Sequence, residues 1–266
     1  MWIGILLGIV GLVLLGSFLY WAFIITEGAY LGARVVAWTY DLTAKKYDQI
    51  KQFKLVDDVW LIAGPLLNKL QDVRTPLVLD IATGTGRLPI ALFSRPLFDG
   101  HVIGLDYSRK MLQEADAKLA LYAGRYTLTW HNAQHLPFPD ETFDAVCCLE
   151  ALEFMPNPKG VLAEMSRVLR SGGLLVVTNR INWEGRLMPG KAFAKDAFRA
   201  LLKKIDLERI EFRIWQVYYD LIFARKKGWR SPHGRNVQEI QHLLKDILFN
   251  KYDAARYDNH AGNDSK

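Results

Sequence analysis

The residues best suited to do chemistry form a glycine-rich turn in the first half of the chain. The segment VLDIATGTGRL places Asp80 at the end of an apolar run, and Gly84 and Gly86 follow it. Glycine lets a backbone turn tightly beside a ligand, and in an open α/β sheet such turns lie at the carboxyl ends of strands, where ligands bind. Many ordinary loops also contain two glycines, so the turn needs a second feature to indicate a binding site.

A second acidic residue supplies that feature. Asp106 ends the next apolar run, HVIGLD, twenty residues after Gly86. A carboxylate at this position can accept both hydrogen bonds of a ribose diol, which indicates a ligand that contains adenosine. A simple strand-end turn carboxylate is the alternative explanation. Nicotinamide-dependent Rossmann enzymes share this geometry, so the two features indicate the ligand and leave the chemistry open.

Further motifs follow in order, and together they resemble class I S-adenosylmethionine (SAM)-dependent methyltransferases. The motifs are residues 80–86, Asp106-Tyr107-Ser108, Asn132-Ala133-Gln134, Leu136-Pro137-Phe138, Phe143-Asp144 and residues 164–173. Within that class they most resemble the ubiquinone/menaquinone-biosynthesis type. The resemblance covers about residues 76 to 180 and rests on these motifs, which follow in order at suitable spacing.

The resemblance implies SAM as the cofactor and assigns the residues that hold its methionine part. These are Asp80 and the turn through Ala82, Gly84 and Gly86. Ala82 stands where the family more often has glycine, a variation that the family also shows.

The resemblance likewise implies which residues hold the adenosine part. Asp106 would bind the ribose hydroxyls, Tyr107 would pack beside the adenine, and Ala133 would present its backbone N–H to the ring. Asn132 stands where the family usually has an aspartate that accepts from the adenine amino group. An asparagine carbonyl can still accept that bond, so we expect weaker binding rather than none.

Two carboxylates follow the fourth apolar run. Glu150 and Glu153 lie near the place where the cofactor sulfonium and the acceptor would meet, and a carboxylate there can hold positive charge or act as a base. A solvated turn and helix start explains them equally well. His131 and His135 flank the adenine motif, and we expect them to be packing or surface residues.

Upstream, Tyr40 and Tyr47-Asp48 fall where the resembled family often has a helix that covers the cofactor. The two cysteines, Cys147 and Cys148, are adjacent, so in a strand they point to opposite faces and cannot easily pair. No metal-ligand spacing surrounds them. We therefore expect no metal site, and two buried thiols in a reducing compartment.

Alternating strands and helices must position these residues. We expect strands near 77–81, 101–106, 126–131, 143–149, 173–179, 209–217 and 219–226, and helices near 87–95, 108–123, 158–170 and 192–205. This alternation predicts crossover units and a parallel sheet covered on both faces, closed by an antiparallel strand pair. The expected fold class is α/β: a Rossmann-like, mostly parallel seven-stranded sheet with an antiparallel edge strand, preceded by a single transmembrane helix.

The N-terminal segment is the most apolar part of the chain. Residues 2 to 25 carry no charge, and a helix of that length spans about 36 Å, enough to cross a bilayer. A cleaved signal peptide is the alternative, disfavoured because no Lys or Arg precedes the run and because the run exceeds the usual length. The nearest basic residues all follow the segment, which predicts a cytoplasmic catalytic domain. They are Arg34, Lys45, Lys46, Lys51 and Lys54.

These features divide the chain into four parts. We expect a transmembrane anchor at 1–26, a helical linker and cofactor lid at 27–75, a methyltransferase domain at 76–228, and a C-terminal helix (236–249) with a disordered tail within 229–266. The Gly64-Pro65 pair interrupts the helical pattern of the second part.

The expected function is methylation of a hydrophobic small molecule, quinone or lipid at the membrane surface. Aromatic and basic residues of the later part of the chain are expected to contact that surface. They are Trp183, Trp215, Tyr218, Tyr219, Trp229, Arg225, Lys226, Lys227 and Arg230. The net charge of +6 is too diffuse to indicate nucleic acid as a partner.

Two other functions stay open. A nicotinamide-dependent oxidoreductase would share the glycine turn and Asp106, but it would not require the motifs at 136–138 and 167–173. A non-catalytic membrane scaffold that retains the fold is the other, and only Asn132 points to it.

Overall fold

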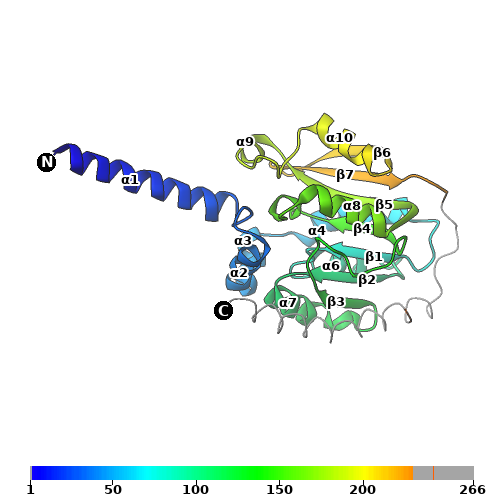
Figure 1. Ribbon diagram of the computed structural model, residues 1–266. Helices are drawn as coiled ribbons and strands as arrows, with labels where there is room; N and C mark the ends of the chain where they lie inside the picture. The colour runs from blue at the N-terminus through cyan, green and yellow to red at the C-terminus, as the bar shows by residue number, and fades with distance from the viewer. Residues whose placement is uncertain (1, 230–241, 243–266) are drawn as a thin grey trace, which may run out of the picture.

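A mixed seven-stranded sheet forms the centre of the molecule in the computed structural model, which describes residues 2–229 and 242 (Figure 1). The strands are β1 (Leu77–Ile81), β2 (His101–Asp106), β3 (Tyr126–Trp130), β4 (Phe143–Cys148), β5 (Leu169–Arg180), β6 (Leu207–Trp215) and β7 (Tyr219–Lys226). Their order is β3-β2-β1-β4-β5-β7-β6. The seven predicted strands are confirmed. β7 runs antiparallel to both of its neighbours, so the antiparallel strand lies one place in from the edge.

Helices cover both faces of this sheet. They are α6 (Arg87–Phe93), α7 (Arg109–Leu119), α8 (Pro158–Val168) and α10 (Lys195–Lys204); the short helix α9 (Asn182–Arg186) follows the end of β5. Side chains cap the N-termini of two of these helices. Ser108 Oγ accepts from Met111 N at 3.1 Å at the start of α7, and Asn157 Oδ1 accepts from Gly160 N at 3.0 Å at the start of α8. Each bond satisfies a backbone N–H that the first helical turn leaves without a partner.

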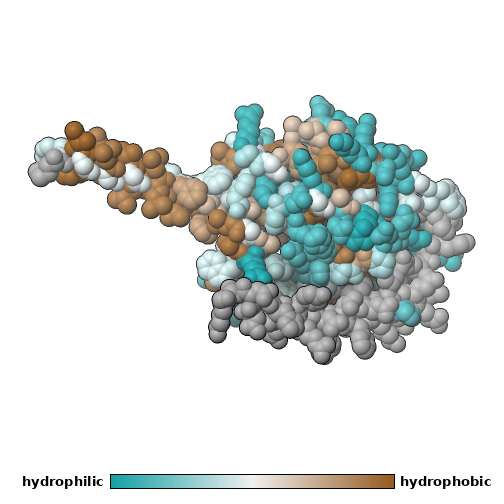
Figure 2. Space-filling view, in the orientation of Figure 1, coloured by the Kyte–Doolittle hydropathy of each residue, from teal (hydrophilic) through white to brown (hydrophobic). Residues whose placement is uncertain are grey.

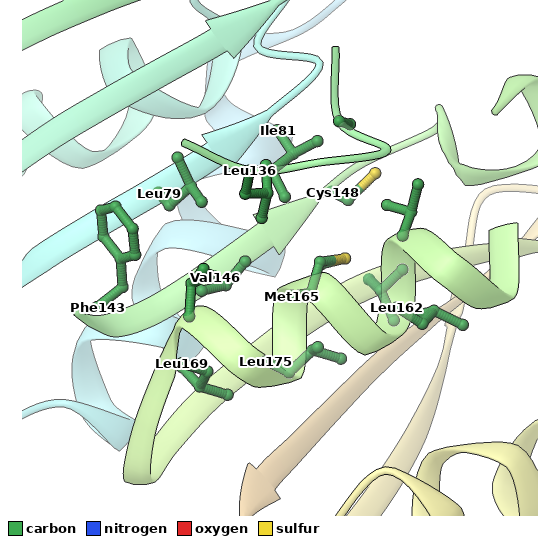
Figure 3. Close-up of a cluster of buried hydrophobic side chains, with 14 of the residues drawn as sticks. Leu79, Ile81, Leu136, Phe143, Val146, Cys148, Leu162, Met165, Leu169 and Leu175 are labelled. Carbon is green, nitrogen blue, oxygen red and sulfur yellow. The ribbon is translucent and has the colours of Figure 1, made fainter. Parts of the chain in front are cut away.

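The core divides into two clusters, one on each face of the sheet. Leu79, Cys148 and Met165 belong to the cluster under α8, which Figure 3 shows. Val78 and Cys147 belong to the cluster on the other face. Successive strand residues point to opposite faces, so the two free, buried cysteines are separated by the sheet, as the sequence predicted.

Short helices precede the sheet. They are α2 (Ala33–Thr43), α3 (Tyr47–Lys51), α4 (Leu55–Asp58) and α5 (Gly64–Lys69), with a 3₁₀ turn at Ala44–Lys46 and a π-helical turn at Val59–Ala63. Near Gly64-Pro65 the helix widens into the π turn and continues, because Pro65 lies in the first turn of α5, where a missing N–H costs little. The interruption is therefore a change of helix geometry.

The N-terminal helix α1 (Trp2–Tyr20) projects away from the body of the molecule and is followed by a π-helical turn at Trp21–Ile25 (Figure 1). None of the residues of α1 is buried, and its surface is almost entirely apolar (Figure 2). The span Trp2–Ile25 has 24 residues and a hydropathy of 2.5, long and apolar enough to cross a membrane. A signal sequence has the same properties, so the anchor stays a prediction.

The residues expected at the membrane surface lie elsewhere than predicted in several cases. Trp215 and Tyr219 are buried. Arg225 pairs in register with Leu174, near the start of β5, because β7 runs antiparallel. The end of β7 that carries Arg225 therefore lies at the edge of the sheet opposite to the edge from which α1 leaves. There Arg225 donates to the carbonyls of Gly172 and Lys69, and Lys226 donates to that of Leu169, so this basic turn holds the fold together. The predicted helix at 236–249 and Arg230 lie outside the described residues.

Candidate functional site

The glycine-rich turn begins at the end of β1 and leads directly into α6. Ala82, Gly84 and Gly86 all have positive φ, at 54°, 55° and 85°. A Cβ on Gly86 would also lie 3.3 Å from Leu119 of α7. Positions 84 and 86 therefore favour glycine because the backbone there is left-handed, a conformation that other residues adopt at a cost. At Gly86 close packing also leaves little room for a side chain.

Asp106 joins this turn to the end of β2. Its Oδ2 accepts from Gly84 N at 2.9 Å, and its Oδ1 accepts from Ser108 N at 2.8 Å. Burial raises the pKa of Asp106 to about 6, against the lowering effect of these backbone N–H donors. Each carboxylate oxygen has a second lone-pair site, so both can still accept from a hydroxyl.

Asp80 stabilises the turn from inside the protein. It is buried, accepts from Thr83 Oγ1 at 2.7 Å and does not line the cavity described below. Burial raises its pKa to about 7. The position supports a role in shaping the loop.

An aromatic stack forms the far side of the site. Tyr107 lies parallel to Trp130, with ring centroids 5.6 Å apart and an interplanar angle of 5°. Trp130 Nε1 donates to Tyr107 O at 2.9 Å, and the Arg109 guanidinium lies 4.1 Å from the Trp130 ring centroid. These contacts hold the Tyr107 ring in place beside the cavity.

The adenine motif follows β3. Asn132 Oδ1 accepts from Gln134 N at 3.0 Å, which fixes the side chain in a turn, and Ala133 is buried. One lone pair of the Asn132 carbonyl oxygen thus accepts from its own loop, and the second can still accept a hydrogen bond.

These residues converge on a single cavity that contains about 730 Å³ of space, its open mouth included. Six of the eight predicted cofactor residues line it: Ala82, Gly84, Asp106, Tyr107, Asn132 and Ala133. Asp80 and Gly86 do not. The cavity lies at the carboxyl ends of the parallel strands, where open α/β sheets bind ligands.

The segment before the sheet covers the cavity. Ala33, Val36, Ala37 and Tyr40 of α2 line it, and so does Tyr47 of α3. Tyr40 donates to Glu27 Oε2 at 2.5 Å. Burial raises the pKa of both tyrosines well above the ordinary value, so they stay protonated donors at neutral pH. This placement supports the covering helix expected at Tyr40 and Tyr47.

Hydrogen bonds tie the covering helices to the motif loops. Asp41 Oδ1 accepts from Ser108 Oγ at 2.5 Å, and Asp48 Oδ1 accepts from Thr85 Oγ1 at 2.6 Å. Each bond joins a residue before the sheet to a residue of a predicted motif. The sequence indicated Asp48 but gave no signal for Asp41, whose partner is decided by the packing of α2 on α7.

Glu150 follows the end of β4. Its Oε1 accepts from Arg87 Nη1 at 2.8 Å, from Trp215 Nε1 at 3.0 Å and from Gln216 Nε2 at 3.2 Å. Glu150 lines the cavity and has a positive φ of 51°. Three donors on one oxygen hold this carboxylate in one orientation.

Arg87 was not singled out from the sequence, although it is central to this arrangement. Besides Glu150, it binds Asp58 through Nε at 2.8 Å and Nη2 at 2.6 Å, and its guanidinium lies 3.9 Å from the centroid of the Phe53 ring. Asp58 is almost fully buried. Arginine directly after the Gly86 turn was the available signal, but its partners come from distant segments.

Glu153 lies away from the cavity. It is buried, accepts from Tyr219 Oη at 2.5 Å and lies 3.6 Å from Arg180. Burial raises its pKa, while Tyr219 and Arg180 lower it. The structure therefore separates the two predicted carboxylates: Glu150 lines the cavity and Glu153 does not.

His131 lines the cavity, whereas His135 does not. Within residues 2–229 and 242, no group of three or more His, Cys, Asp or Glu residues is arranged to hold a metal ion.

Comparison with known proteins agrees with the geometry. Residues 79–177 match a family described as a methyltransferase domain. Demethylmenaquinone methyltransferase of Lactiplantibacillus plantarum is 44% identical over 101 residues, which cover 37% of this chain and 43% of that protein. Phosphatidylethanolamine N-methyltransferase of Cereibacter sphaeroides is 38% identical over 104 residues, covering 38% and 49%. The chain spans about half the length of the curated relatives it matches.

Solved structures share the fold at low identity. A putative SAM-dependent methyltransferase from Methanococcus maripaludis has a TM-score of 0.56 at 20% identity, covering 71% of this chain and 94% of that one. The [4+2]-cyclase SpnF has a TM-score of 0.59 at 16% identity, covering 74% and 97%. Since one of these proteins is a cyclase, the fold alone does not decide the reaction.

By the order of its motifs, its cavity and the matched residues 79–177, this part of the chain is similar to the methyltransferase domains of SAM-dependent enzymes. Its sequence is similar to that of quinone-biosynthesis methyltransferases. The cofactor implied by this class is SAM, and the cavity suits it: a diol acceptor at Asp106, an aromatic wall at Tyr107 and a carboxylate at Glu150 lie around one space.

Proposed function

We propose that this protein is a SAM-dependent methyltransferase that acts on a hydrophobic acceptor carried by a membrane, to which α1 anchors it. The observation that carries the proposal is the position of the cavity. It is covered by α2, the first helix after the apolar span Trp2–Ile25. An acceptor dissolved in the bilayer would therefore meet the site close to the membrane.

The residues of the cavity have distinct roles in this proposal. Asp106 binds the ribose hydroxyls, and Tyr107 and Ala133 contact the adenine. When bound, SAM supplies an electrophilic methyl group on a positively charged sulfur. The protein mainly aligns the acceptor with that methyl group and excludes water. Glu150, held by Arg87 and Trp215, places negative charge at the reacting end of the cavity.

The acceptor is expected to be a membrane lipid or quinone. The names of two relatives, a demethylmenaquinone methyltransferase and a phosphatidylethanolamine N-methyltransferase, support this class. The covering residues Ala33, Val36 and Ala37 are small and apolar, and Tyr40 and Phe154 add aromatic surface, which suits an apolar acceptor.

A methylation assay with full-length protein tests the proposal. The protein, reconstituted in bilayers with a total lipid extract, receives SAM with a labelled methyl group, and the lipid and aqueous fractions are analysed by mass spectrometry. We expect one labelled species in the lipid fraction. Label found only in a water-soluble product would contradict the membrane acceptor, and no label anywhere would contradict the activity.

Cofactor binding is tested separately by isothermal titration. We expect SAM to bind and nicotinamide dinucleotides not to bind, and Asp106→Ala to weaken SAM binding at least tenfold. Loss of two hydrogen bonds to a diol, each worth about 1 kcal/mol or more, predicts that factor. Unchanged affinity in Asp106→Ala would show that the site is assigned wrongly.

The proposed orientation places the catalytic domain in the cytoplasm, since the basic residues nearest to α1 all follow it. Leu121 is highly exposed on the body of the protein, and both native cysteines are buried. A membrane-impermeant maleimide is therefore expected to label Leu121→Cys only after the cells are lysed. Labelling in intact cells would reverse the orientation.

A further inference from the structure

Exposed apolar and aromatic side chains gather at the edge of the sheet from which α1 leaves. They come from α2 (Trp38, Leu42), from α9 and the residue directly after it (Trp183, Leu187) and from the β6–β7 turn (Val217). These five residues, named here the pocket-edge surface, are each more than two-fifths exposed. A contiguous patch of large, exposed apolar side chains indicates an interaction surface.

The topology explains why three distant segments reach the same edge. α9 follows the end of β5, and the β6–β7 turn follows the end of β6, which runs parallel to β5. Ile181 N donates to Tyr218 O at 2.8 Å, which joins α9 to that turn. Trp21 Nε1 donates to Leu187 O at 3.0 Å and Tyr30 Oη to Pro189 O at 2.8 Å, which joins the base of α1 to the segment of α9.

Helix α2 has two apolar faces. Its inner face, with Val36, Ala37 and Tyr40, lines the cofactor cavity. Its outer face presents Trp38 and Leu42, four residues apart and therefore on one stripe, and they are 56% and 63% exposed. One helix thus separates the cavity from the outer apolar stripe.

Basic residues accompany this stripe. Arg34 precedes Trp38 by one helical turn, and Lys45 and Lys46 follow Leu42 in the next turn; all three are exposed. An exposed helix with Trp and Leu on its apolar stripe and basic residues around it is typical of a segment that lies in the headgroup layer. Figure 2 shows that the brown apolar surface of α1 continues onto the adjoining part of the body.

We propose that the pocket-edge surface rests in the headgroup layer of an anionic bilayer, so that the cofactor cavity faces the membrane and α2 lies between the two. The inference rests on the proposed anchor and deepens it, because it assigns the catalytic domain a fixed orientation on the bilayer. Two observations favour lipid over a protein partner: the surface begins where α1 ends, and its flanking charges are positive. The acceptor then reaches the cavity beside α2 without crossing water.

Depth measurement in nanodiscs tests this orientation. Full-length protein is reconstituted in phosphatidylcholine–phosphatidylglycerol nanodiscs, with single cysteines introduced by Trp38→Cys, Leu42→Cys, Leu6→Cys or Leu121→Cys and labelled with an environment-sensitive fluorophore. The buried native cysteines do not compete for label. Leu121, at 92% exposure, follows α7 and precedes β3, so it lies at the opposite edge and serves as the control. Unchanged SAM affinity verifies that each variant is folded.

We expect nitroxide-labelled lipids to quench positions 38 and 42 severalfold more strongly than position 121, with blue-shifted emission. Position 6 reports the anchor alone. If position 6 is quenched but positions 38 and 42 are quenched no more than position 121, the proposed orientation is wrong and the anchor still holds. A surface that binds a protein partner instead of lipid would give this result. Absence of quenching at position 6 would overturn the anchor and the orientation together. Methyl transfer to a lipid is measured independently of either outcome.

Discussion

Asp80 and Asp106 are both buried carboxylates at the ends of neighbouring strands, but their partners differ. Asp106 accepts from the backbone N–H groups of Gly84 and Ser108, whereas Asp80 accepts from the Thr83 hydroxyl. Hydrogen bonds that favour the charged form lower the pKa of an acid, while burial raises it. The pKa of Asp80 is accordingly raised further, to about 7, than that of Asp106, which reaches about 6.

Asp80→Asn is expected to remove a pH dependence of stability. An acid whose pKa is higher in the folded chain binds its proton more tightly there, so its contribution is full below pH 4 and is lost as pH rises through about 7. The variant should match the wild type near pH 4 and exceed it at pH 8, by roughly 4 kcal/mol at most. Urea unfolding at both pH values measures the difference, and an equal difference at each pH would contradict the assignment.

Arg87 is expected to stabilise the site through charge and shape together. Arg87→Leu leaves the buried carboxylates of Asp58 and Glu150 without their partner, which should cost about 3–5 kcal/mol of unfolding free energy. Arg87→Lys keeps the charge but loses the two-pronged bond to Asp58, so we expect a smaller loss. Chemical denaturation compares the two variants. Equal losses would show that charge alone does not stabilise the site, and that the guanidinium group itself is needed.

At the scale of elements, the predicted motifs all lie in the part of the chain that forms the sheet, and the helices before the sheet cover the cavity that these motifs line. α2 is attached through Asp41, which accepts from Ser108 Oγ and from Lys110 N at the start of α7. α4 is attached through Asp58 to Arg87, at the start of α6. α2 and α4 are thus each attached to the start of a helix that follows a motif loop. We therefore expect cofactor affinity to depend on the position of α2.

Ser108→Ala is expected to act on two elements at once. It removes the hydroxyl that begins α7, a loss of about 1 kcal/mol, and it also removes the donor to Asp41 on α2. We expect lower stability and weaker SAM binding together, measured by thermal unfolding and by titration calorimetry. Ser108→Thr keeps the hydroxyl and is the matched control. Loss of stability with unchanged SAM affinity would show that α2 does not respond to Asp41.

At the scale of the whole molecule, an apolar rod and a globular domain meet at one edge of the sheet (Figure 1). α1 makes no buried contact with the body, so its exposed apolar surface must be covered by something other than the described part of this chain. A bilayer satisfies both the length and the composition of the span. The basic residues Arg225 and Lys226, at the end of β7, lie at the other edge and bind backbone carbonyls of the fold instead.

Leu12→Arg is expected to weaken membrane retention. Leu12 lies in the middle of α1 and is 71% exposed. An arginine near the centre of a transmembrane helix costs about 2.5–3.5 kcal/mol of insertion free energy. Alkaline extraction of membranes should release more of this variant than of the wild type, while the control Leu121→Arg should be retained. Full retention of Leu12→Arg would contradict a span by α1.

The sequence by itself determined the sheet, because its strands are short apolar runs whose ends carry the motif residues. It predicted β1, β2 and β7 to the residue, and six of the eight proposed cofactor residues line the cavity. The strand predictions succeed because period and turn chemistry are local properties of the chain, and the order of motifs that indicates the cofactor residues is local as well.

Only the tertiary structure decided which of these residues meet. Glu150 and Glu153 are three residues apart, yet a positive φ at Glu150 leaves one lining the cavity while the other is buried against Tyr219. Arg87 and Asp58 bind each other across 29 positions, and the direction of β7 places Arg225 away from the edge of the sheet from which α1 leaves. Partners of this kind depend on strand direction and helix packing, which no local pattern contains.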